Sequence, residues 1–293
     1  MSAKAKVRRE RARLAIVAPA CALKPETAER VRVFSEATLG ASAPELFFHP
    51  QCFLSEGHFA GPDAARSAAF LDAANDPAFE AVWFARGGYG ACRLEESVFE
   101  KLAPAARAKT YMGYSDLGFI LGRLSALRIG KPVHGPMPAD INRSGGEAAI
   151  ERALRYLALG DEAGLEPAAR KARAGARPVA AFNLTILVHL LAARRAPDFA
   201  GCVVMVEEVA EHHYRIDRAL CALASSPEMR RAAGLMLGRC SDIPENDPPF
   251  LKTEEEIARH WCERFGVPYL GRADIGHDAA NKIVPFGEAA ALA

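Results

Sequence analysis

Three segments in the first half of the chain combine residue types that could carry out chemistry, and the first is a glycine turn. Residues 86–90 read Arg-Gly-Gly-Tyr-Gly and follow directly on the apolar run 81–85. Consecutive glycines allow a sharp turn, and they leave backbone N–H groups free to face an anion or an oxyanion. The turn lacks the Gly-x-Gly-x-x-Gly and Gly-x-x-x-x-Gly-Lys-Ser/Thr patterns that hold phosphates. We therefore expect an oxyanion-binding turn or a structural turn rather than a phosphate-binding loop.

The second segment is a serine between an expected strand and an expected helix. Ser115 follows Gly113 and Tyr114 and precedes a helical stretch at 117–127. A serine on such a turn exposes its hydroxyl above a helix N-terminus, whose N–H groups can stabilise a developing oxyanion. Hydrolase elbows usually read Gly-x-Ser-x-Gly, whereas Leu117 fills the last position here. Because serine is also a good helix N-cap, Ser115 is either a nucleophile or a cap.

The third segment begins at His134, at the end of an expected strand and directly before Gly135-Pro136-Met137. A single histidine at the end of a strand is more often a hydrogen-bonded structural residue than a catalyst. We therefore expect a structural role for His134.

A serine nucleophile needs a base to take its proton, and the base needs an acid to orient it. The second half of the chain supplies candidates for both. Glu207 and Glu208 follow the apolar run 203–206, and His277 lies near the end of the chain. Carboxylates at the end of an apolar strand are partly desolvated, as a triad acid would be. The alternative is a solvated acidic turn.

Strand-like and helix-like segments alternate in the first half of the chain. The apolar runs are continuous rather than alternating, which is typical of parallel strands that are buried on both faces. We therefore expect an α/β fold with a mostly parallel, Rossmann- or flavodoxin-like sheet, whose functional groups lie at the carboxyl ends of its strands. The expected strands are 14–17, 45–48, 81–85, 110–114 and 131–134, and the expected helices are 26–39, 62–74 and 117–127.

The second half contains a similar alternation behind a change in composition. Ser144 to Glu147 has the spacing of a capping box and is expected to open a helix that runs to residue 159. Residues 161–177 are rich in Ala, Gly, Arg and Glu and are interpreted as a linker. The chain is thus expected to form a domain at 1–160 and a second domain at 178–293. In the second domain we expect strands at 179–180, 203–206 and 234–237, helices at 184–193 and 216–224, and a helix to 265 opened by a capping box from Thr253 to Glu256.

The composition excludes several classes of protein. At 293 residues, with 50% hydrophobic and 25% charged residues, the chain has the makeup of an ordinary globular protein of one large or two modest domains. Lys+Arg 37 against Asp+Glu 36 gives no general electrostatic reason to bind nucleic acid or anionic lipid. The seven cysteines are scattered without a Cys-x-x-Cys pair, so a zinc site and a disulfide framework are not expected. They fit small buried side chains in a reducing, cytoplasmic compartment.

The N-terminus combines basic residues with a short apolar run, as a signal peptide does. Pro19 interrupts that run after five residues, which is shorter than the usual hydrophobic region. We therefore expect a first β-strand behind a basic tail, and we expect no membrane span, since the most apolar stretch, 178–193, is short and contains Asn183 and His189. The basic residues are Lys4, Lys6, Arg8, Arg9, Arg11 and Arg13.

Taken in order, the motifs resemble those of the LD-carboxypeptidase family of serine peptidases, the muramoyltetrapeptide carboxypeptidases of peptidoglycan recycling. The resemblance covers nearly the whole chain. Its motifs are Ile16-Val17-Ala18-Pro19, Phe59-Ala60-Gly61-Pro62-Asp63, the turn 86–90 with Arg93, 113–116, 134–137, Asn183-Leu184-Thr185, Val206-Glu207-Glu208, 214–218, Gly276-His277 and Pro285-x-Gly287.

The resemblance implies a triad in which Ser115 is the nucleophile, Glu207 the orienting acid and His277 the general base. It implies an α/β N-terminal domain and a smaller C-terminal α/β domain with its own sheet, and it places the catalytic groups from both domains in the cleft between them. The implied substrate is a murein tetrapeptide that ends in D-alanine. The implied assembly is a homodimer without a metal ion or other cofactor.

Three further residues are candidates for oxyanion or substrate binding. The backbone N–H groups of Gly88 and Asp116 are expected to hold the oxyanion, and Arg86 is expected to bind the terminal carboxylate, because a guanidinium pairs bidentately with a carboxylate. The chain departs from the family pattern where Ala181-Phe182 replaces Gly-Gly before Asn183, and where Glu208 replaces the usual Asp.

Two other functions are compatible with these residues. One is a self-immunity peptidase that cleaves peptidyl-nucleotide antibiotics, although such enzymes tend to be longer. The other is a non-catalytic protein whose glycine turn holds an anion.

Overall fold

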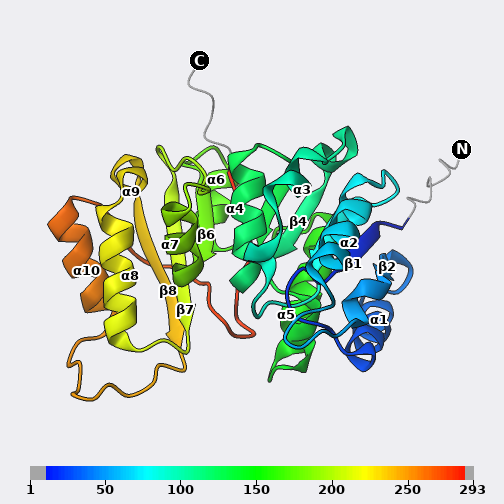
Figure 1. Cartoon of the computed structure of the whole chain (residues 1–293), viewed down its shortest axis with the longest axis horizontal. Coiled ribbons are helices and arrows are strands. Elements are labelled where there is room, and N and C mark those ends of the chain that lie inside the picture. The colour runs from blue at the N-terminus through cyan, green and yellow to red at the C-terminus, as the bar shows by residue number, and fades with distance from the viewer. Residues whose placement is uncertain (1–10, 288–293) are drawn as a thin grey trace, which may run out of the picture.

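A computed structural model describes residues 11–287 of the chain. Lys4, Lys6, Arg8 and Arg9 of the expected basic tail lie outside these residues. Two lobes lie side by side along the longest axis, each built on its own sheet (Figure 1). None of the helices in residues 11–287 is both long and apolar enough to cross a bilayer.

The first lobe is a six-stranded sheet with the order β10-β5-β4-β3-β1-β2. Five of its strands are parallel, and only β10 runs antiparallel, to β5. Strands β1 and β3 are apolar along almost their whole length and are buried on both faces, as a central parallel strand requires. The strands are β1 (Arg13–Val17), β2 (Glu45–Phe48), β3 (Ala81–Phe84), β4 (Thr110–Gly113), β5 (Lys131–His134) and β10 (Val284–Pro285).

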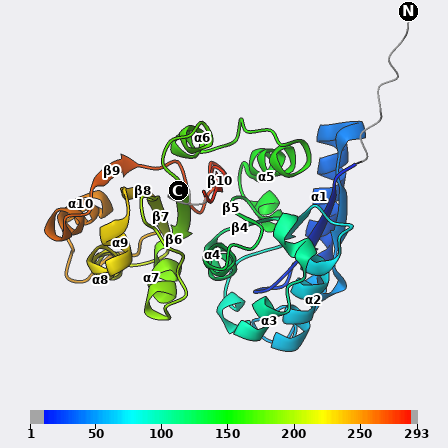
Figure 2. The ribbon, with the colours of Figure 1, turned by 90° about the horizontal axis from the view of Figure 1, so that it is seen from above.

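Helices cover both faces of this sheet. Helices α1 and α5 lie on one face, and α2, α3 and α4 lie on the other (Figure 2). Each face has its own apolar core: Val31 and Ile150 belong to one, Phe70 and Ile120 to the other. The helices are α1 (Pro25–Leu39), α2 (Asp63–Asn75), α3 (Glu96–Glu100), α4 (Gly118–Ala126) and α5 (Gly146–Leu154).

The second lobe is a four-stranded parallel sheet with the order β6-β7-β8-β9. Helices α7, α8 and α10 enclose an apolar core on one face, and Ala169 of α6 packs on the other face. The elements are β6 (Val179–Asn183), α7 (Leu184–Ala192), β7 (Val203–Val209), α8 (His213–Ser225), α9 (Pro227–Arg231), β8 (Gly234–Ser241), α10 (Glu254–Phe265) and β9 (Tyr269–Arg272), preceded by α6 (Pro167–Arg173).

The expected fold class is therefore confirmed, and so is one of the two expected capping boxes. Thr253 and Glu256 exchange capping hydrogen bonds at the start of α10. The capping box from Ser144 to Glu147 is wrong. Helix α5 is capped by Gly145 with φ 71°, without a side-chain hydrogen bond, so the serine lies one residue outside the cap, and Glu147 pairs with Arg30 instead.

The two lobes are joined along one helix pair and by the last strand. Helix α4 packs on α7, and a Cβ at Gly122 would lie only 2.7 Å from Leu190 Cδ1, so the glycine permits the close approach. The segment after β9 returns to the first lobe, adds β10 to its sheet and packs Phe286 against Phe182, with ring centroids 5.0 Å apart (Figure 1). The segment 161–177, interpreted as a linker, contains α6.

Candidate active site

Ser115 lies where β4 ends, in the first position of a short 3₁₀ helix, η5 (Ser115–Leu117). Its φ is 60°, in the left-handed region, which costs a non-glycine residue about 1–3 kcal/mol. The N-cap of η5 is Tyr114 and no side chain caps the helix, so the interpretation of Ser115 as a helix cap is wrong. A strained serine between a strand and a helix is the geometry of a nucleophile elbow.

The glycine turn lies directly against this serine. A Cβ at Gly87 would be 3.1 Å from Ser115 Oγ, so a larger residue would have to displace the hydroxyl by a few tenths of an ångström. Gly88 has φ 105° and lies so close to Cys21 that a Cβ would overlap its Sγ. Among the residues described, neither the Gly88 N–H nor the Asp116 N–H has a hydrogen-bond acceptor. Both groups are therefore free to bind an incoming oxygen.

The side chain of Asp116 ties the turn to the serine. Its Oδ2 accepts a hydrogen bond from the Ala91 N–H at 2.7 Å. Burial raises the pKa of Asp116 to about 6, against the opposing effect of the hydrogen bonds from Ala91 and Gly90. Asp116 thus couples the position of the glycine turn to that of the neighbouring Ser115.

His277 and Glu207 form a buried pair. His277 Nδ1 is hydrogen-bonded to Glu207 Oε2, and the two residues are only 8% and 0% exposed. Burial lowers the pKa of His277, but the adjacent Glu207 carboxylate outweighs this and raises the pKa above its ordinary value. In the described part of the chain, Glu207 Oε1 has no partner.

Tyr114 connects this pair to the serine. Its ring lies 4.9 Å from the His277 ring, between centroids, so the residue before Ser115 packs directly on the imidazole. Within residues 11–287, Ser115 Oγ makes no hydrogen bond to His277 or to any other group. The structure therefore joins Glu207 to His277 and brings His277 to the end of β4, while the hydroxyl and the imidazole are not bonded.

Glu208 has a different environment from its neighbour. It accepts hydrogen bonds from the Asn183 side chain at 2.6 Å, the Thr185 N–H at 3.0 Å and the Thr185 hydroxyl at 2.7 Å. Successive side chains of a strand point to opposite faces, so only one of two adjacent acids can reach His277. Glu208 instead anchors the start of α7, and both acids lie within β7 rather than in a solvated turn.

His134 and Arg86 lie apart from the His277–Glu207 pair. His134 is buried, its Nε2 is 3.1 Å from Asn281 Oδ1, and burial lowers its pKa to about 4. These contacts agree with the structural role expected for it. Arg86 is exposed at the edge of the glycine turn, where its guanidinium donates to the Ala22 carbonyl at 3.3 Å. Within the described residues it makes no hydrogen bond to Ser115, Glu207 or His277.

Arg239 is a functional candidate that no sequence motif indicated. Its guanidinium binds Asp274 at 2.6 Å and Asp278 at 3.0 Å, on either side of His277. It thereby fixes the segment that carries the imidazole. The adjacency of Asp278 to His277 was visible in the sequence, but the arginine comes from β8, 38 residues earlier.

Gly238, also in β8, lies beside Glu207 and gives a prediction about the His277–Glu207 pair. A Cβ there would lie 2.7 Å from Ile275 Cγ1 and 2.9 Å from Glu207 Cβ. Gly238→Ala should therefore move Glu207 away from His277, lower the raised pKa of His277 toward its ordinary value, and cost about 1–3 kcal/mol of unfolding free energy. NMR titration of the imidazole and thermal unfolding measure both effects.

Gly175→Ala is the matched control for Gly238→Ala. Gly175 has φ 90° with nothing within 4 Å of its Cβ position, so the substitution adds backbone strain far from the site. It should lower stability and leave the His277 titration unchanged. An unchanged titration in Gly238→Ala would contradict the prediction.

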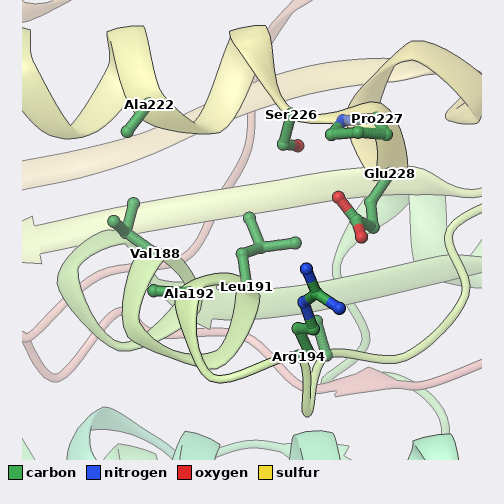
Figure 3. Close-up of a pocket in the computed structure, with 9 residues that line it drawn as sticks. Val188, Leu191, Ala192, Arg194, Ala222, Ser226, Pro227 and Glu228 are labelled. Carbon is green, nitrogen blue, oxygen red and sulfur yellow. The ribbon is translucent and has the colours of Figure 1, made fainter.

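A separate cavity of about 650 Å³ lies in the second lobe, between α7 and the junction of α8 with α9 (Figure 3). Val188 and Leu191 form its apolar wall, and the side chains of Arg194 and Glu228 point toward each other across it. None of the site residues lines it. Within residues 11–287, no group of three or more His, Cys, Asp or Glu could hold a metal ion.

The protein is a two-lobed α/β protein with one sheet in each lobe. A strained serine follows a strand of the first sheet, and a buried His–Glu pair lies beside it. Residues 14–135 match the N-terminal domain of LD-carboxypeptidases, and residues 178–292 match their C-terminal domain. The chain belongs to the LD-carboxypeptidase family.

Curated relatives cover most of the chain. A putative carboxypeptidase from Synechocystis is 32% identical over 241 residues, which span 80% of this chain and 77% of the relative. A murein tetrapeptide carboxypeptidase from Pseudomonas aeruginosa is 28% identical over 230 residues, which span 74% and 73%.

Solved structures share the fold. The muramoyltetrapeptide carboxypeptidase from Oxalobacter formigenes has a TM-score of 0.74 at 22% identity and covers 94% of this chain and 92% of its own. A microcin self-immunity protein in complex with aspartyl sulfamoyl adenosine has a TM-score of 0.73 at 14% identity, covering 94% and 91%. At these identities the likeness concerns the fold alone.

Proposed function

We propose that the protein is a serine LD-carboxypeptidase that releases terminal D-alanine from murein tetrapeptides. The observation that carries this proposal is the buried His277–Glu207 pair packed against the strand end that bears Ser115. Family membership and the name of the Pseudomonas relative support the substrate class.

The first half of the proposed reaction forms an acyl-enzyme. With its Nδ1–H donated to Glu207, His277 has Nε2 free to accept the proton of Ser115 Oγ. The oxygen attacks the carbonyl on the diaminopimelate side of the bond, and the N–H groups of Gly88 and Asp116 hold the oxyanion. One such donor contributes about 10²–10³-fold to the rate.

The second half releases the products. The imidazolium of His277 gives its proton to the nitrogen of D-alanine as the C–N bond breaks. Water, deprotonated by the same imidazole, then attacks the ester on Ser115. The acyl C–O bond breaks, the imidazolium returns the proton to Ser115 Oγ, and the tripeptide leaves. Arg86 remains the candidate for the terminal carboxylate, since it is exposed on the turn and its one bond in residues 11–287 is to the Ala22 carbonyl.

The test is to incubate the protein with murein tetrapeptide and to quantify tripeptide and free D-alanine. A peptide that ends in L-alanine is the control, because it has the same atoms and the opposite configuration at the leaving residue. Release of D-alanine alone supports the proposal. No release, or equal release from both peptides, contradicts it.

The raised pKa of His277 predicts the pH dependence of the reaction. Only the neutral imidazole accepts the serine proton, so kcat/KM should fall as the pH drops through the pKa of His277. Because Glu207 raises this pKa, the midpoint of the acidic limb should lie above 6.5, the ordinary value for histidine. A pH profile measures it, and a midpoint at or below 6.5 would count against the His277–Glu207 assignment.

A second candidate function is cleavage of a peptidyl nucleotide, because a self-immunity protein of the same fold binds aspartyl sulfamoyl adenosine. Measuring the hydrolysis of a peptidyl nucleotide and of the tetrapeptide in parallel distinguishes the two functions. A fluorophosphonate that leaves Ser115 unlabelled would instead favour a non-catalytic anion-binding protein.

The homodimer and the cytoplasmic location also belong to the proposal. Light scattering, which measures the mass of the particle in solution, tests the homodimer.

A further inference from the structure

A chain of hydrogen bonds joins the strand end that carries Ser115 to the backbone of His277. The Tyr114 hydroxyl donates to Asp140 Oδ1 at 2.8 Å. Arg143 donates through Nε to the same oxygen at 2.9 Å. Its Nη1 donates to the carbonyl oxygen of His277 at 2.8 Å. Residues from three places in the sequence thus connect the two sides of the site.

The inner end of this chain is rigid. Tyr114 and Asp140 are both buried, and Asp140 Oδ2 also accepts a hydrogen bond from the Met137 N–H at 2.8 Å. The ring of Tyr114 packs on the imidazole of His277. Asp140 is therefore held in place by contacts that do not involve the arginine, and it can serve as a fixed anchor.

The outer end depends on Arg143. Within residues 11–287, its bond is the only hydrogen bond to the backbone of His277. An arginine can make both bonds at once because its guanidinium presents several donors in a fixed plane, which a lysine ammonium does not. The Arg143 side chain is 44% exposed, so little apolar packing accompanies these two bonds.

We propose that Arg143 is a positioning residue that sets the distance and angle of His277 relative to Ser115, by tying the His277 carbonyl to Asp140. The inference rests on the proposed triad. Its physical basis is that the reaction rate falls steeply when a catalytic group is displaced, by about 10²-fold for a displacement near 1 Å.

The chain contains a matched control in Arg152. Arg152 lies in α5 and reaches the segment that carries His277. Its guanidinium donates to the carbonyls of Ala279 at 2.6 Å and Asn281 at 3.2 Å. It therefore holds the same segment without contacting His277. Loss of either arginine removes two hydrogen bonds, but only Arg143 donates one of them to His277 itself.

The experiment compares Arg143→Met, Arg143→Lys and Arg152→Met by the rate at which a fluorophosphonate labels Ser115, by kcat and KM for D-alanine release, and by thermal unfolding. We expect Arg143→Met to slow labelling and lower kcat by about 10- to 100-fold with less change in KM. Arg143→Lys should recover part of the rate. Arg152→Met should lose stability and keep labelling within about 3-fold of the unmodified protein.

The pH profile adds a readout that a merely structural role would not move. The titratable and charged groups around His277 are Glu207, which is hydrogen-bonded to it, Glu208 on the opposite face of β7, Tyr114 directly after β4, His134 on β5, and Arg143. Arg143 is the cation among them and lowers the pKa of His277. Arg143→Met should therefore shift the acidic limb of the labelling rate to higher pH.

Labelling needs no murein substrate, so the two proposals can fail separately. If Ser115 is labelled but no D-alanine is released, the proposed substrate is wrong. The labelling rates of the variants then still decide the role of Arg143. Wild-type labelling rates in Arg143→Met, or an equal loss in Arg152→Met, would overturn the positioning role. If Arg143→Met does not fold, Arg143→Lys decides, and a labelling rate equal to that of the unmodified protein overturns the proposal. Protein that is never labelled would overturn both.

Discussion

Ser115→Ala is expected to lower kcat for D-alanine release by about 10⁶-fold, the scale found when the nucleophile of a serine triad is removed. The proposed reaction has no other group that could form the acyl intermediate, because the free oxyanion donors at Gly88 and Asp116 stabilise charge but do not attack. Substrate binding should change little, since the hydroxyl is a small part of the contact with a peptide. D-alanine release and the affinity for tetrapeptide measure the two effects.

Ser115→Gly is the control for folding at this position. Because residue 115 has φ 60°, glycine relieves strain that both serine and alanine carry. The glycine variant should unfold at the same temperature as the alanine variant or a higher one, and both should be equally inactive. Retained D-alanine release in either variant would exclude Ser115 as the nucleophile.

Glu207→Gln is expected to lower kcat by about 10³–10⁴-fold with the fold intact. An amide in place of the carboxylate can donate to His277 Nδ1, which favours the wrong tautomer and leaves Nε2 protonated. It also removes the negative charge that stabilises the imidazolium formed when Ser115 loses its proton. The variant should therefore bind tetrapeptide but hydrolyse it very slowly.

Glu208→Gln provides the matched comparison, one residue away on the same strand. It removes a buried carboxylate that accepts hydrogen bonds from Asn183 and Thr185, so it should cost about 1–3 kcal/mol of unfolding free energy. Its effect on kcat should stay within about 10-fold, because Glu208 does not contact His277. If Glu208→Gln were the more damaging change to kcat, the assignment of the acid would be reversed.

The sequence predicted the order of the elements well because local signals were strong. The continuous apolar run of β3 and the capping box from Thr253 to Glu256 each depend on a few adjacent residues. The failure at Ser144 has a local cause too. The next residue, Gly145, takes a left-handed conformation that ends the extended segment and caps α5 itself.

The second sheet was harder to predict because its strands carry polar residues at their ends. The apolar run from Val203 suggested a strand that ends before Glu207, but β7 continues through both acids to Val209. Pairing with β6 and β8 satisfies the backbone of this polar end, which a hydrophobic pattern does not reveal. The short exposed strand β9 was missed for the same reason.

The candidate site could be predicted only as far as residue types allow. Ser115 was recognisable from its place between a strand and a helix, but neither its positive φ nor the approach of Gly87 to its hydroxyl is encoded in a local pattern. The choice between Glu207 and Glu208 depends on which face of β7 each one occupies. The links through Asp140 and Arg143 join residues more than 100 positions apart in the sequence, and no local pattern encodes them.

The most direct test of the central claim is mass spectrometry of the protein quenched during turnover of tetrapeptide. An acyl-enzyme mechanism predicts a transient adduct with the mass of the tripeptide less one water, carried by the peptide that contains Ser115 and absent from Ser115→Ala. D-alanine release without any such adduct under rapid quenching, or an adduct on a different residue, would contradict it.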